Sequence, residues 1–106
     1  MHWIYLILAI VFETAGTLSI KQATLGNPYF WSIVVTICYI ISFTFIYYAA
    51  QKIEIGIAYA IWAAVGTALI VLLGWLIFGD DMNSIKIAGV LFIIFGVVLL
   101  KLQTTV

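Results

Sequence analysis

Three short polar breaks divide this chain into four apolar stretches, and each stretch is long enough to cross a lipid bilayer. A membrane-spanning helix needs about 20 mostly apolar residues. The expected spans cover residues 3–20, 29–50, 55–78 and 85–101, so residues 1–106 are expected to form a single four-helix transmembrane domain. Helices are expected because strands of a membrane barrel alternate in polarity over about ten residues, and no such alternation is visible.

The breaks carry turn-forming and charged residues. Residues 21–28 form the first expected loop, which ends on Gly-Asn-Pro, a strong turn signal. Residues 51–54 form the second break and residues 79–83 the third. Asn83 or Ser84 is expected to cap the last helix.

The composition excludes several classes of protein. Hydrophobic residues make up 67% of the chain, and only four basic and four acidic residues are present. A soluble domain is about 45–50% apolar and about 25% charged, so a water-soluble enzyme is excluded. The net charge is zero and there is no basic patch, which excludes nucleic-acid binding. Since no metal-ligand cluster, nucleophile–histidine pair or phosphate-binding loop is visible, we expect no enzyme activity, no metal and no cofactor.

The four lysines divide equally between the two sides of the membrane. Lys52 and Lys101 are expected on one side, and Lys21 and Lys86 on the other. The positive-inside rule therefore gives little preference for either orientation. We expect dual topology, in which two oppositely oriented copies pair as an antiparallel dimer. The alternatives are a weak bias from the insertion machinery and an orientation imposed by a partner chain.

Glu13 is the one charged residue in the middle of an expected span. A charge there costs about 2.5–3.5 kcal/mol on insertion scales, so it indicates a function or a partner. Ala9, Gly16 and Thr17 lie at helical spacing from Glu13 and form a small, slightly polar stripe beside it. Because a low dielectric disfavours the charged carboxylate, Glu13 is expected to exchange protons for a cation. The alternative is a protonated glutamic acid that only links two helices.

An interfacial belt of aromatic residues at the span ends does not explain Tyr39, Tyr59 and Trp62. Tyr59 and Trp62 share one helix face, and desolvated cation–π contacts contribute about 2 kcal/mol or more. A carboxylate with aromatic walls suits hydrophobic or quaternary ammonium ions. Ordinary packing of large side chains is the alternative.

Small residues mark two further positions. Ala64 and Gly66 in the third span predict a bend or hinge. Gly89 and Gly96 lie seven residues apart on one face of the fourth span, which favours close helix contact between two subunits.

Residues 13–21 (ETAGTLSIK) and 56–62 (GIAYAIW), together with Cys38-Tyr39, Ser42-Phe43 and residues 86–89, resemble the small multidrug resistance family over essentially the whole chain. The resemblance implies alternating access by an antiparallel dimer in the bacterial inner membrane, driven by the proton gradient. It implies that Glu13 binds both protons and substrate. The other residues expected to line or flank the substrate are Ala9, Gly16, Thr17, Tyr39, Ser42, Phe43, Tyr59 and Trp62, with Gly89 and Gly96 in the dimer contact.

The chain departs from the family pattern at the expected hinge and from the guanidinium-exporting subtype beside Glu13. The family usually has Gly-x-Gly in the third span, where this chain has Ala64-Val65-Gly66. The guanidinium-exporting subtype has Trp and Ala at the positions of Gly16 and Thr17, so this chain is more similar to the Qac-type exporters of quaternary ammonium and polyaromatic cations.

The expected function is proton-coupled efflux of organic cations by a homodimer in contact with membrane lipid. The alternatives within transport are a guanidinium exporter and one subunit of a heterodimeric polyamine (spermidine) exporter, which residues 16–21 and 84–89 also resemble. A non-transporting structural or regulatory subunit and a channel are the alternatives of other classes.

Overall fold

The computed structural model describes residues 2–102, and within them four helices account for nearly all of the chain. They are α1 (His2–Leu25), α2 (Pro28–Ala49), α3 (Ile55–Phe78) and α4 (Ser84–Leu102). Each is long and apolar enough to cross a membrane by length and composition. The prediction of an all-helical chain with four membrane-crossing helices is confirmed.

The first helix is longer than the sequence suggested. The expected span stops at Ile20 and the expected loop starts at Lys21, but α1 continues to Leu25. That boundary was wrong because lysine has a good helix propensity and its long side chain can reach water from within a helix. The helix instead closes where the Gly26 N–H donates to the Gln22 carbonyl oxygen at 2.9 Å.

Asparagine side chains cap the first turns of α2 and α4. The Asn27 side chain accepts hydrogen bonds from the backbone N–H groups of Tyr29 and Phe30, and proline occupies the first turn of α2. The Asn83 side chain likewise accepts from the Lys86 N–H at 2.9 Å, at the start of α4. Each cap satisfies backbone donors that have no partner within the helix.

A left-handed glycine ends α3. Gly79 has φ of 72° and ψ of 24°, a conformation that costs glycine little. The N–H groups of Gly79 and Asp80 both point to the Gly74 carbonyl oxygen, the latter at 3.2 Å. This closure turns the chain sharply, so that Asp80 lies against the last turns of α3.

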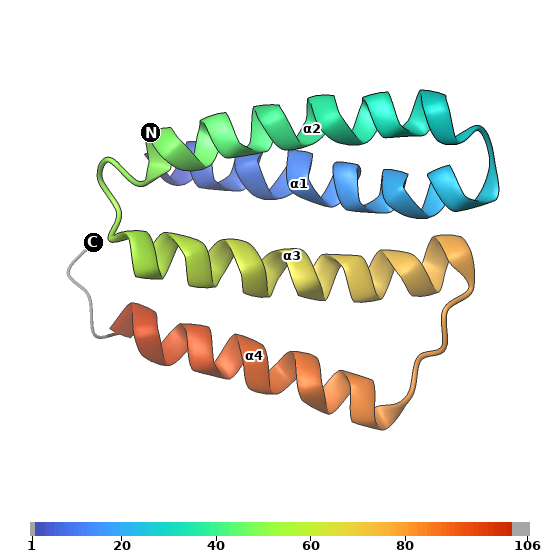
Figure 1. The fold of residues 1–106 in the computed structure, drawn as a ribbon. Coiled ribbons are helices and arrows are strands. Elements are labelled where there is room, and N and C mark those ends of the chain that lie inside the picture. The colour runs from blue at the N-terminus through green and yellow to red at the C-terminus, as the bar shows by residue number, and fades with distance from the viewer. Residues whose placement is uncertain (1, 103–106) are drawn as a thin grey trace.

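The helices form a flat slab rather than a closed bundle (Figure 1). α1 packs along α2, α3 lies beside α1, and α4 contacts α3. The slab measures 45 × 34 × 16 Å along its principal axes, and α4 contributes no buried residue. Most large apolar side chains are therefore exposed in a single subunit.

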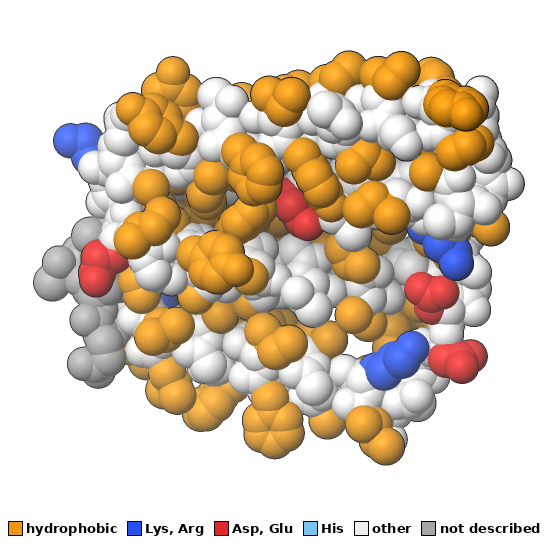
Figure 2. Space-filling view, in the orientation of Figure 1, with side chains coloured by type: hydrophobic (Ala, Val, Ile, Leu, Met, Phe, Trp, Pro, Cys, Tyr) orange, Lys and Arg blue, Asp and Glu red, His pale blue; other side chains and the backbone are white. Residues whose placement is uncertain are grey.

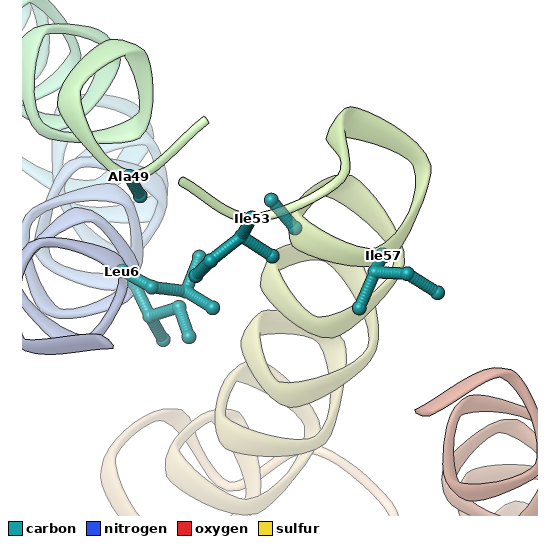
Figure 3. Packing of buried hydrophobic residues seen from close by; sticks show 6 residues of the cluster. Leu6, Ala49, Ile53 and Ile57 are labelled. Atoms are coloured by element: carbon teal, nitrogen blue, oxygen red, sulfur yellow. The ribbon is translucent and has the colours of Figure 1, made fainter. Parts of the chain in front are cut away.

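The tightest packing lies at one end of the slab. Leu6 of α1 and Ala49 of α2 cluster with Ile53, which lies in the loop before α3 (Figure 3). Ile57 of α3 belongs to the same buried cluster, and its side chain lies on the side of α3 away from Ile53. Ile53 is 1% exposed, although it belongs to a loop. At the same end, the Lys101 ammonium lies 5.5 Å from the centroid of the Trp3 ring and connects α4 to α1. This end of the slab is therefore closed.

Truncation of Ile53 should loosen the closed end. The change Ile53→Ala removes a fully buried side chain at the junction of three helices, and we expect a loss of about 2–5 kcal/mol in the free energy of unfolding. Denaturant titration in detergent micelles measures this. Ile55→Ala is the matched control, because Ile55 is 66% exposed. Equal losses in the two variants would contradict the packing described.

Candidate functional site

Glu13 lies midway along α1 and its carboxylate faces α3. The Thr17 hydroxyl, one turn further along α1, donates to Glu13 Oε1 at 2.8 Å. A Cβ atom on Gly66 of α3 would lie 3.0 Å from Glu13 Oε2. Because glycine has no side chain, α3 leaves room for the carboxylate where any other residue would crowd it. The acid thus lies between α1 and α3, held by a hydroxyl on one side and facing bare backbone on the other.

α2 reaches the carboxylate through Thr17. The Tyr39 hydroxyl and Thr17 Oγ1 are 2.6 Å apart, and the Tyr39 hydroxyl is the donor when the single Thr17 proton goes to Glu13 Oε1. Tyr39 comes this close because Gly16 leaves space for its ring, where a Cβ would lie only 2.6 Å from a ring carbon. A chain of hydroxyl groups therefore runs from α2 to Glu13 and orients its side chain.

A hollow of about 360 Å³ opens between α1 and α3 beside this carboxylate. Tyr59 and Trp62 stand on its wall with their rings edge to face, 5.7 Å between centroids. Figure 2 shows one acidic side chain midway along the molecule among apolar side chains, whereas the other charged side chains visible on this face lie near its two ends. The complete lining is Glu13, Thr17, Tyr59, Trp62, Ala63, Gly66, Thr67, Ile70 and Val71.

Several residues expected at the substrate site lie elsewhere in the single subunit. Ala9 and Ser42 are fully buried between α1 and α2, where Ser42 Oγ donates to the Ala9 carbonyl oxygen at 2.6 Å. Gly16 and Tyr39 pack against each other at the same interface. Phe43 is 54% exposed and lies outside the lining of the hollow. Its ring is edge to face with the Trp62 ring, with 5.8 Å between the centroids.

The residues expected at the hinge lie in α3, and those expected at the dimer contact lie in α4. α3 runs as one helix through Ala64 and Gly66, both of which are buried. Gly66 contacts the Glu13 carboxylate, a role that the hinge interpretation did not include. Gly89 and Gly96 lie on α4, where a Cβ on either would meet nothing within 4 Å. These two glycines therefore border open space in the described part of the chain.

Sequence reasoning missed four lining residues of α3: Ala63, Thr67, Ile70 and Val71. They follow Tyr59 at intervals of three or four residues or lie next to such a position, so they share its face of the helix. Extending the face of Tyr59 and Trp62 by two more turns would have found them. Two buried polar groups have no hydrogen-bond partner among the described residues: the Trp62 ring N–H and the Thr14 hydroxyl.

The chain matches a model of a known protein family along nearly its whole length. The family model described as Small Multidrug Resistance protein matches residues 1–103. The matched region includes all four helices and every residue of the hollow.

A side chain at position 66 should interfere with ligand binding beside Glu13. In Gly66→Ala the new Cβ lies 3.0 Å from Glu13 Oε2, so the carboxylate has to move, at a cost typical of overpacking, about 1–3 kcal/mol. We expect weaker binding of tetraphenylphosphonium, measured by equilibrium dialysis in detergent. Gly56→Ala is the control in the same helix, because a Cβ there meets nothing within 4 Å. Unchanged affinity in Gly66→Ala would contradict the contact.

Proposed function

Since this chain belongs to the small multidrug resistance family, we propose that it is a proton-coupled antiporter that exports hydrophobic or quaternary ammonium cations by alternating access. Members of this family are efflux transporters of small molecules in the plasma membrane; they are not enzymes and use no cofactor. They bind their substrates as dimers. The proposal concerns the substrate class, the coupling to protons and the residues that carry them.

The observation that carries the proposal is the Glu13 carboxylate on the wall of an apolar hollow, opposite bare backbone and beside two aromatic rings. A carboxylate attracts any cation, but water competes strongly for small hydrated ions. Tyr59 and Trp62 add ring faces and apolar area, which favour organic cations that shed their water at little cost. The combination selects by charge and hydrophobicity rather than by an exact shape.

Proton coupling follows from competition for the same oxygens. When Glu13 holds a proton, its carboxyl group has no charge with which to balance an organic cation. When the cation binds, the proton must leave. The Thr17 hydroxyl holds the carboxyl group in place by donating to Oε1. If two protons exchange for one monovalent cation, one net charge moves, and about 2.3 kcal/mol per 100 mV of membrane potential drives it.

A second copy completes the site in this proposal. The hollow is partly open, the slab is only 16 Å thick, and α4 buries nothing. An antiparallel partner would cover the open face, contribute a second Glu13 and use the bare backbone at Gly89 and Gly96 for close contact. The equal division of lysines supports opposite orientations.

The packing around Gly16 supports quaternary ammonium over guanidinium as the substrate class. A Cβ at this position would lie 2.6 and 2.7 Å from atoms of the Tyr39 ring. The tryptophan that guanidinium exporters carry here would therefore need Tyr39 to leave Thr17. Guanidinium export and polyamine export by a heterodimer are the outcomes against which the substrate class is tested.

Transport into proteoliposomes tests the proposed function. With an imposed pH gradient, we expect uptake of tetraphenylphosphonium to exceed uptake of guanidinium or spermidine. Glu13→Gln should abolish uptake, because glutamine neither releases a proton nor balances a cation. Glu13→Asp should keep binding with an altered pH dependence. Proton-driven uptake that survives in Glu13→Gln would refute the role of Glu13, and a preference for guanidinium or spermidine would refute the substrate class.

Orientation is tested by labelling the loop between α2 and α3. A cysteine placed at Gln51, in a variant in which Cys38 is replaced by serine, leaves all four lysines in place and should react with a membrane-impermeant thiol reagent from both sides of the membrane. A cysteine at Met82, in the loop between α3 and α4, should also react from both sides. Labelling of each position from one side alone would contradict dual topology.

A further inference from the structure

A second hollow continues the first toward the open end of the slab. It has a volume of about 310 Å³ and shares Thr17 and Ile70 with the hollow at Glu13. Its outer part is lined by Lys21 and Thr24 of α1 and by Phe78 and Asp80 at the end of α3. A path therefore leads from the middle of the membrane-spanning region to the loop between α3 and α4.

The carboxylate of Asp80 lies in this outer hollow much as Glu13 lies in the inner one. A Cβ atom on Gly74 would lie 2.5 Å from Asp80 Oδ2, so the acid is folded back against bare backbone of α3. Gly66 gives Glu13 the same kind of place, with 3.0 Å to Oε2. Two carboxylates thus lie against two glycines of one helix.

The spacing of these glycines sets the separation of the two acids along the path. Gly66 and Gly74 are eight residues apart, which is about 12 Å along a helix axis. Thr17 lies between them, where the two hollows meet. The path therefore has an acid at its inner end, an acid at its outer end and largely apolar walls between them.

Asp80 is exposed, and the hollow beside its carboxylate leaves room for a cation. The carboxylate lies at the C-terminal end of α3, where the helix dipole is negative. Within residues 2–102 no hydrogen bond or ion pair joins its side chain to another residue. Lys21 lines the same hollow and is the nearest opposing charge in it. An organic ammonium group in the outer hollow would balance both the acid and the end of the helix.

We propose that the path from Glu13 to Asp80 binds elongated dications, with one cationic group at each carboxylate and the connecting chain along the apolar wall. The proposal rests on the proposed function, because it assigns one cationic group to Glu13. A dication of matching length keeps its second charge near the membrane surface and avoids burying two charges at the centre. Shorter dications cannot place both charges, and monocations use the inner acid alone.

Direct binding in detergent tests the inference. The probes are hexamethonium and decamethonium, two bis-quaternary ammonium ions of different length, and decyltrimethylammonium, which has one charge on a similar chain. Asp80→Asn should weaken the binding of decamethonium by about threefold to fivefold, the upper range for an exposed ion pair. It should change the affinity for decyltrimethylammonium by less than about twofold, and hexamethonium should lose less than decamethonium.

Asp81→Asn is the matched control, because it removes the same charge one residue away, outside the lining of the outer hollow. It should leave the affinity for decamethonium unchanged. Equal losses in the two variants, or no loss in Asp80→Asn, would overturn the inference. Retained binding of decyltrimethylammonium shows that Asp80→Asn is folded and leaves the proposed function standing. Failure of the unaltered protein to bind any of the three cations would instead refute the proposed function.

Discussion

The structure depends on one constraint: a carboxylate in the middle of a membrane-spanning helix needs space and hydrogen-bond donors inside the protein. α1 presents Glu13 toward α3, and α3 accommodates it because Gly66 has no side chain. The Thr17 hydroxyl fixes one carboxylate oxygen and Tyr39 fixes Thr17 from α2. Residues of α1, α2 and α3 thus together accommodate the Glu13 carboxylate. The same arrangement leaves the other side of the carboxylate open to a hollow, where a proton or a cation can reach it.

The two ends of the slab differ in how tightly their helices pack. At one end, Leu6, Ala49 and Ile57 belong to one buried cluster that joins α1, α2 and α3, and Lys101 reaches across to Trp3. At the other end the helices enclose a second hollow with Asp80 at its outer edge. In the proposed function, the difference between the two ends would correspond to one state of the alternating-access cycle. An antiparallel second copy would bring a closed end beside each open end.

Much of this could be predicted from the sequence, because a bilayer requires long apolar helices and penalises charges within them. That reasoning identified four helices and singled out Glu13. It could not predict which helices meet within one subunit. Ala9, Gly16 and Ser42 are near Glu13 in sequence or by family resemblance, yet they form the contact between α1 and α2. Asp80 looked like an ordinary loop acid, since nothing local indicates that Gly79 turns it back onto Gly74.

The central claim is that protons and organic cations compete for Glu13. Calorimetry of tetraphenylphosphonium binding tests it most directly, carried out at one pH in two buffers with different heats of ionisation. The account predicts that the observed heats differ between the buffers, because each bound cation displaces protons that the buffer takes up. The difference should shrink as the pH is raised and the carboxyl group is already deprotonated. Equal heats in both buffers, at a pH where acidification weakens binding, would contradict the account.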